Sequence, residues 1–199
     1  MMEGVRTLIR RMQSYIQITQ MAPIARRYFV KDGLDGSMTT LGIVVGSWVV
    51  RVAEPLIIVT AGLGACLAMG ISGFFGAYMT ERAERKRSLK ILESAMLTNL
   101  KNSIHNEASD FVSVYAALID GASPMLTAVI ALIPFMLALT GMLGIWDAYV
   151  ISIILTLSTL FLLGLYLGRI AREKVLMYGV QAVAVGMLIV ITVLVLGTI

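Results

Sequence analysis

The sequence predicts an all-α integral membrane protein with five transmembrane helices and a short cytoplasmic helical insert. Hydrophobic residues make up 58% of its 199 residues and charged residues only 14%, whereas a soluble domain is about half apolar and a quarter charged. Long uncharged runs separate the charged residues, and none has the two-residue alternation of a barrel strand. This composition excludes an ordinary soluble enzyme and a nucleic-acid-binding protein.

Four uncharged runs are each long enough to cross a hydrocarbon core of roughly 30 Å as a helix. They cover residues 55–80, 121–146, 148–168 and 175–199. A fifth segment, residues 31–50, reaches this length only if it includes Asp32 and Asp35. We interpret it as the first span because Arg51 marks its far end. Asp35 is then a carboxylate inside the bilayer, while Asp32, beside Lys31, is expected to be solvated or paired.

The basic residues indicate how these spans are oriented. Every Lys and Arg except Arg51 falls before or at the start of the first span, between the second and third, or between the fourth and fifth. Cytoplasmic loops are enriched in Lys and Arg, so we expect a cytoplasmic N-terminus and a C-terminus outside the cell. The absence of long targeting extensions favours the cell membrane of a prokaryote.

The parts outside the spans are expected to be helical as well. Residues 1–30 have the pattern of an amphipathic helix on the cytoplasmic membrane surface. Residues 81–120 have a single apolar stripe and are expected to form a cytoplasmic insert between helices 1–2 (31–80) and helices 3–5 (121–199). About forty residues are too few to bury a core alone. The stripe must therefore pack on a second copy of the chain or on the membrane domain. Together with the odd number of spans and their small-residue faces, it favours a homodimer.

Small residues recur within the spans at intervals of three or four. This spacing lets helix backbones approach each other in lipid, and close packing is the expected role of Gly42, Gly46, Gly70, Gly73 and Gly76.

Asp35 is the strongest candidate for a functional residue, because an ionisable group inside a span is costly and usually has a role. A second candidate is a carboxylate–imidazole metal site around the insert. Its residues would be Glu81, Glu84, His105, Glu107 and Asp110. The alternative is a solvated helix face, in which Glu81 pairs with Arg85 four residues on. The sequence shows no nucleophile–base pair of the kind that would indicate an enzyme.

Three segments resemble the vacuolar iron transporter family. DGLDGSMTTLGIVVG (residues 32–46) resembles its first span, TAGLGACLAMGISGFFGAYMTERAERK (60–86) its second, and GASPMLTAVIALIPFML (121–137) its third. The number of spans, the cytoplasmic N-terminus and the charged insert are similar too. The resemblance runs from residue 32 to the end of the chain.

The resemblance implies a homodimer that moves ferrous iron or manganese out of the cytosol in exchange for protons, with no permanently bound cofactor. Asp35 would be the first-span aspartate of the ion pathway and a metal ligand. Met38 or Met69 would add a soft ligand on that pathway, which favours ferrous iron over magnesium; ordinary packing is the alternative for both methionines.

The sequence also departs from the family pattern. Two family glutamates are replaced by Ala65 and Ala77, and a family methionine by Gly73. Two other functions therefore stay open. One is a transporter of the same architecture with another substrate, and the other is a non-transporting membrane scaffold that binds partners through its cytoplasmic helices.

Overall fold

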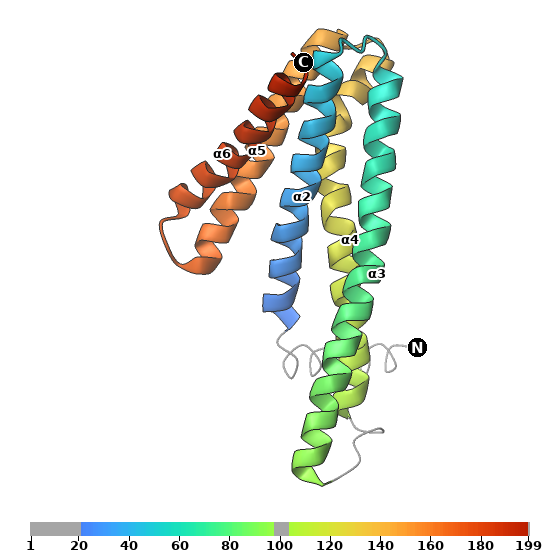
Figure 1. The fold of residues 1–199 in the computed structure, drawn as a ribbon, viewed down its shortest axis with the longest axis vertical. Coiled ribbons are helices and arrows are strands. Elements are labelled where there is room, and N and C mark those ends of the chain that lie inside the picture. The colour runs from blue at the N-terminus through green and yellow to red at the C-terminus, as the bar shows by residue number, and fades with distance from the viewer. Residues whose placement is uncertain (1–20, 98–103, 199) are drawn as a thin grey trace, which may run out of the picture.

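The computed structural model describes residues 21–97 and 104–198, which form five helices and no strand. The helices are α2 (Met21–Val49), α3 (Pro55–Met96), α4 (Ile104–Leu139), α5 (Ile145–Ala171) and α6 (Val175–Leu196). Successive helices run in opposite directions along one bundle (Figure 1). The all-α prediction is confirmed for the described part of the chain.

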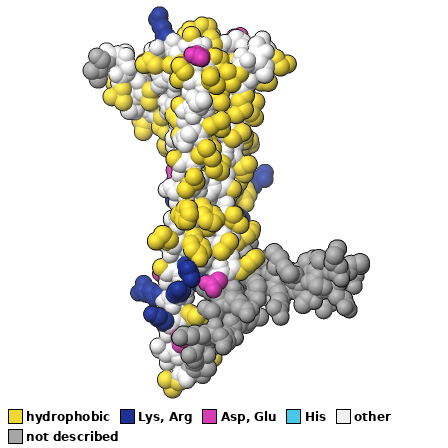
Figure 2. All heavy atoms as spheres, turned by 90° about the vertical axis from the view of Figure 1, so that its right-hand side faces the viewer, with side chains coloured by type: hydrophobic (Ala, Val, Ile, Leu, Met, Phe, Trp, Pro, Cys, Tyr) yellow, Lys and Arg dark blue, Asp and Glu magenta, His cyan; other side chains and the backbone are white. Residues whose placement is uncertain are grey.

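Four of these helices, α3 to α6, are long and apolar enough to cross a membrane. Figure 2 shows hydrophobic side chains over much of one face, with Lys and Arg gathered mainly toward the lower end. This confirms the coarser prediction of a multi-pass helical membrane protein. Helix α2 falls short of the same apolar criterion, and Asp32 and Asp35 lie within it.

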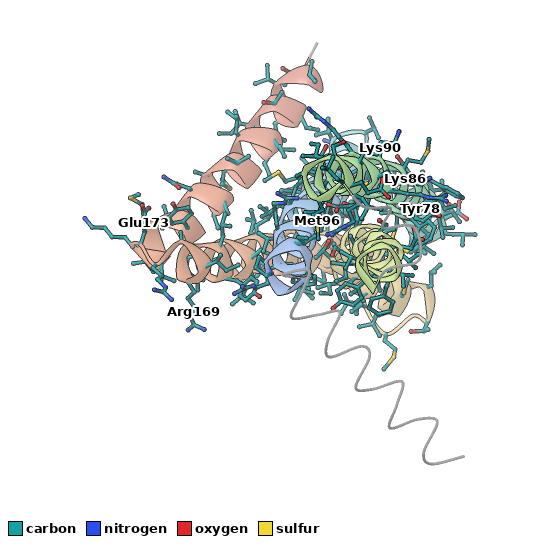
Figure 3. The ribbon with its side chains drawn as sticks, turned by 90° about the horizontal axis from the view of Figure 1, so that it is seen from below. Tyr78, Lys86, Lys90, Met96, Arg169 and Glu173 are labelled. Atoms are coloured by element: carbon teal, nitrogen blue, oxygen red, sulfur yellow. The ribbon has the colours of Figure 1, made fainter. Side chains whose placement is uncertain are left out.

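Helix α2 nevertheless lies inside the bundle, where it packs against all four other described helices. Seen from below in Figure 3, α2 stands between the α5–α6 hairpin, whose end carries Arg169 and Glu173, and the α3–α4 pair. Several of its polar side chains are therefore covered by protein, including Asp32, Ser37 and Thr40. Mean hydropathy counts every side chain as if lipid surrounded the helix. The mean hydropathy of α2 is therefore low, although protein covers several of its polar side chains.

Helix α2 starts earlier than the predicted first span, at Met21. Pro23 lies in its first turn, where a missing N–H costs nothing because the first amides of a helix have no partner within it. Residues 21–30 of the predicted surface helix are thus the first turns of α2, and its residues 1–20 lie outside the described part. The predicted insert comprises the end of α3 and the start of α4, which extend together beyond the other helices (Figure 1).

An apolar and aromatic cluster fills the upper half of the bundle. Tyr149 is fully buried, and its ring meets Phe135 edge-on with centroids 5.0 Å apart. The Tyr149 hydroxyl donates a hydrogen bond of 2.9 Å to the carbonyl of Val52, in the loop after α2. This contact joins the α2–α3 loop to the first turns of α5.

The glycines predicted to pack have different surroundings. A Cβ added at Gly73 would come close to α4, as one added at Gly70 would, whereas at Gly42 and Gly46 the nearest atoms of α6 are 3.9 Å away. Gly76 has no such neighbour within 4 Å. Of these five glycines, only Gly70 and Gly73 lie at a close contact between helices of the single chain, α3 and α4.

Candidate functional site

A cavity of about 410 Å³ lies where α2, α3 and α4 meet, within the size range of ligand sites in proteins. We call it the acidic cavity. Its lining includes three aspartates, two methionines and a serine: Asp32, Asp35, Asp120, Met38, Met69 and Ser72. It thus brings together the three residues that the sequence placed on an ion pathway, Asp35, Met38 and Met69.

Two glycines let the helices approach closely around the acidic cavity. A Cβ added at Gly36 of α2 would lie 2.5 Å from the carbonyl oxygen of Pro124 and 2.6 Å from its Cα. A Cβ added at Gly73 of α3 would lie 2.6 Å from Oδ2 of Asp120. Such distances are far below van der Waals contact. Because residue 73 has no side chain, Asp120 can lie directly against α3.

Asp32 and Asp120 form a buried pair of carboxyl groups across α2 and α4. Each residue is only 6% exposed, and both line the acidic cavity. Asp32 accepts a hydrogen bond of 2.7 Å from Nζ of Lys31 through Oδ1. Its other oxygen, Oδ2, is buried and has no hydrogen-bond partner among the described residues. The lining thus holds two buried carboxyls and a single ammonium group, which contacts Asp32, and Asp35 adds a third acidic group on the exposed part of the lining.

Pro124 adds a further oxygen to this region. Because proline has no N–H, the carbonyl of Asp120, four residues earlier, cannot accept its usual helix hydrogen bond. This oxygen lies 3.3 Å from the Cβ position built at Gly73, close to the Oδ2 atom of the same residue. Both the backbone and the side chain of Asp120 therefore present oxygen atoms toward α3.

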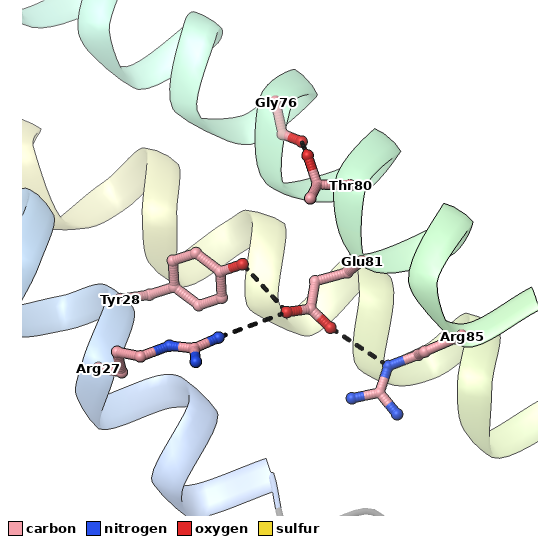
Figure 4. Close-up of polar contacts among 6 residues, drawn as sticks. All are labelled: Arg27, Tyr28, Gly76, Thr80, Glu81 and Arg85. Atoms are coloured by element: carbon pink, nitrogen blue, oxygen red, sulfur yellow. Dashed lines mark hydrogen bonds and ion pairs between the residues drawn. The ribbon is translucent and has the colours of Figure 1, made fainter. Parts of the chain in front are cut away.

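Glu81, a candidate from the insert set, is engaged in a separate polar cluster (Figure 4). The Tyr28 hydroxyl donates to its Oε1 at 3.0 Å, and Arg85 Nε lies 3.4 Å from its Oε2. Arg27 lies 3.9 Å away. The ion pair with Arg85 that the four-residue spacing predicted is present. Burial, and then the hydrogen bond to Glu81, raise the pKa of Tyr28.

The other insert candidates are not gathered into a site. Glu84 and Asp110 are exposed on α3 and α4, and the side chains of His105 and Glu107 lie outside the described part. Among the described side chains, no three His, Cys, Asp or Glu residues converge closely enough to hold a metal ion.

Sequence reasoning did not place Asp120 on a cavity. For Asp32 it predicted solvation or pairing, and Asp32 is paired with Lys31 and also buried. In the sequence, Asp120 is simply the charged residue that precedes the uncharged run at 121–146. A signal was present, because a lone carboxylate four residues before a proline and directly before a glycine is unusual in an apolar helix. What the sequence does not contain is the contact between Asp120 and α2, about ninety residues earlier.

The fold and the cavity define a class of protein: a multi-pass α-helical membrane protein with an acidic cavity inside its bundle. No protein-family model matches the chain. The chain is 33% identical over 161 residues to an uncharacterized protein of Methanocaldococcus jannaschii, MJ0645, an alignment that covers 79% of this chain and 81% of that protein. It belongs to the same family as this archaeal protein.

Proposed function

We propose that the protein is a transporter that exchanges a divalent metal cation, ferrous iron or manganese, for protons. The observation that carries this proposal is the acidic cavity. Carboxyl groups are costly inside a membrane bundle and usually mark an ion or proton pathway. Here two of them, Asp32 and Asp120, are buried together and Asp35 lies on the same cavity.

The charge balance of the cavity favours a cation as substrate. Its lining holds three aspartates but a single basic residue, Lys31. Carboxylates that face each other in a medium of low polarity repel strongly. Either a metal ion or protons relieve this repulsion, and the two compete for the same oxygen atoms. Such competition is the physical basis of exchange.

The remaining ligands favour a transition-metal ion over magnesium. Met38 and Met69 both line the cavity, and thioether sulfur prefers softer metals. Since no three acidic side chains converge in the part of the chain that the structure describes, a bound ion would keep some of its water or take further ligands from a second copy of the chain. Partial hydration suits an ion that must also leave.

A homodimer is part of the proposal, and the exposed face of α3 supports it. Small residues follow each other there at every fourth position, the arrangement that brings membrane helices together. The stripe consists of Thr60, Gly64, Ala68, Ser72, Gly76 and Thr80, all exposed. Ser72 also lines the acidic cavity, so a partner at this face would stand beside the proposed ion site.

The topology completes the proposal. We infer that α2 is a fifth span, because it runs alongside α3 and α4 within the bundle (Figure 1). The lower end, which carries most of the basic residues, would be cytoplasmic, and the C-terminus would lie on the other side in the cell membrane of a prokaryote.

The decisive experiment is transport in liposomes. Purified protein is reconstituted, and the influx of Mn²⁺ or Fe²⁺ is followed together with a pH-sensitive dye. We expect metal influx coupled to opposite proton movement. Asp35→Asn and Asp120→Asn should each reduce it by about tenfold or more, because each removes a carboxylate from the cavity. Asp147→Asn, at an exposed position at the other end of the bundle, is the matched control.

Two results would contradict this function. If wild type moves neither metal, the alternatives of another substrate or a non-transporting scaffold replace it. If both aspartate variants transport like Asp147→Asn, the acidic cavity is not the pathway.

The dimer is tested separately. Gly64→Leu combined with Ala68→Leu places two large side chains on the small-residue stripe, whereas Leu67→Ala changes a neighbouring position. We expect the first variant to be monomeric and the second dimeric in native mass spectrometry. A monomeric wild type would rule out this part of the proposal.

A further inference from the structure

A second cavity, of about 590 Å³, lies on the other side of α2, against α5. We call it the basic groove. It occurs where the α5–α6 hairpin bends away from α2 toward the lower end of the bundle (Figure 1). Its apolar walls are formed by Val30, Leu34 and Met38 of α2 and by Leu167 and Ile170 of α5.

The charges around the basic groove are the reverse of those in the acidic cavity. Its lining includes Arg26, Arg27 and Lys31 but a single acidic residue, Asp35. The three cationic residues lie in the early turns of α2. The apolar wall residues Val30, Leu34 and Met38 continue along the same helix at four-residue intervals, which places them on one face. The groove is therefore cationic at its entrance and apolar along its length.

This pattern matches an amphiphile with a negative head and a hydrocarbon tail. We propose that the basic groove binds one anionic phospholipid, with its phosphate at Arg26, Arg27 and Lys31 and an acyl chain between α2 and α5. Basic clusters between membrane helices near the cytoplasmic surface are suited to such head groups. The planar guanidinium group also matches phosphate oxygens in pairs.

Arg27 and Lys31 already have polar neighbours, but these leave room for a phosphate. Arg27 lies 3.9 Å from Glu81 and 5.4 Å from the ring centre of Tyr28, yet its side chain is 69% exposed. Lys31 contacts Asp32 at 2.7 Å and is 64% exposed. An arginine has five N–H donors and a lysine three, so each retains donors beyond those contacts.

A lipid explains the groove better than a free anion. Inorganic phosphate or glycerol phosphate would neutralise the basic entrance but would leave the apolar walls uncovered. An acyl chain covers both Leu34 on α2 and Leu167 on α5, and it reaches them directly from the surrounding bilayer. The inference needs only that the chain lies in a membrane, and it does not depend on the transport proposal.

The test compares two lipids with identical acyl chains and different head groups. Native mass spectrometry of the delipidated full-length protein is titrated with phosphatidylglycerol or phosphatidylcholine. We expect one phosphatidylglycerol molecule to bind about tenfold more tightly than phosphatidylcholine. Arg26→Gln, Arg27→Gln and Lys31→Gln combined should remove this preference. The control is Arg82→Gln, Lys86→Gln and Lys90→Gln, which neutralises three exposed basic residues of α3.

A second variant tests the tail independently of the charges. Leu167→Trp fills the apolar part of the groove and should also weaken phosphatidylglycerol binding while the basic residues stay intact. Equal binding of the two lipids, or equal losses in the groove and control triple variants, would overturn the proposal. It would also fail if glycerol phosphate displaces the lipid completely, or if the lipid binds only after residues 2–20 are deleted, because that segment would then be the occupant.

Discussion

The two sides of α2 are packed in different ways. Toward α4, a Cβ added at Gly36 would meet backbone atoms of Pro124. Toward α5, a Cβ added at Gly33 would meet only side-chain atoms, the flexible tip of Leu163 at 3.3 Å and, on α4, the methyl group of Thr127 at 3.4 Å. The first contact holds two helices at a fixed short distance, and the second allows adjustment. The acidic cavity lies on the rigid side and the basic groove on the adaptable side.

This difference shows how one helix can serve two cavities of opposite charge. Both cavities are bordered by Lys31, Asp35 and Met38. The other residues around each cavity decide the sign of its charge. On the α4 side Asp32 and Asp120 make the surroundings negative; on the α5 side Arg26 and Arg27 make them positive. A site for a small ion benefits from fixed geometry, while a chain-like ligand tolerates a wall that can shift.

The largest effect should come from adding a single methyl group on the rigid side. Gly36→Ala forces α2 and α4 apart, and overpacking of this kind costs about 1–3 kcal/mol. Gly33→Ala should cost clearly less because the Leu163 side chain can move. Gly42→Ala, with its nearest neighbour 3.9 Å away, is the control. The measurement is thermal unfolding in detergent, and equal shifts for Gly33→Ala and Gly36→Ala would remove the distinction between the two sides.

The next largest effect should follow from Lys31→Met, because this lysine borders both cavities. The change leaves Asp32 buried without its hydrogen-bonded cation. We expect a loss of about 1 kcal/mol, less than for a fully buried pair, since the ammonium group is largely exposed and therefore screened. Asp32→Asn in the same chain should recover most of the loss. No recovery in this double-mutant cycle would show that the ion pair does not stabilise the acidic side.

A smaller loss is expected for Ser152→Ala. The Ser152 hydroxyl donates a hydrogen bond of 2.6 Å to the carbonyl of Ala131, joining α5 to α4, and such bonds in membrane bundles contribute about 0.6 kcal/mol. Ser158→Ala is matched, because Ser158 bonds only within α5, to the carbonyl of Ile154. Unfolding midpoints should differ between the two variants. If they agree, this bond does not help to hold α5 against α4.

The smallest effect concerns the polar cluster below the cavities. Since the pKa of Tyr28 is raised by burial and by its hydrogen bond to Glu81, the neutral phenol is the favoured form. The resulting stabilisation is present below the ordinary tyrosine pKa of about 10 and is lost as pH rises through the raised value. Glu81→Gln should shift phenolate absorbance toward lower pH, with Glu84→Gln as control. An unchanged titration would mean that Glu81 does not act on Tyr28.

The sequence predicted the helices better than their contacts. Runs without charges identified α3 to α6, and the position of Arg51 identified the end of α2 even though its aspartates lower its hydropathy. Asp35, Met38 and Met69 were selected because polar or soft groups inside a span are informative in themselves. Periodicity places such residues on a face of their own helix.

Periodicity does not say which helix that face contacts. Asp120 was not recognised because its importance arises from Asp32 and Gly73, which belong to two other helices. For the same reason, the two-sided role of Lys31 was not foreseen. These contacts depend on where Gly36 and Gly73 allow backbones to approach, which only the packed bundle determines.

The length of α3 has a mechanical consequence. Its 42 residues form one continuous helix of roughly 63 Å, about twice the thickness of a hydrocarbon core. Ser72 and Gly73, on the wall of the acidic cavity, lie near its middle, and Met96 ends its projecting half. Its first turns are held in the buried cluster by Ile58 and Val59. A stiff rod held near one end tilts as a whole when its other end is pushed, so a sideways load near Met96 would move the cavity wall without a hinge.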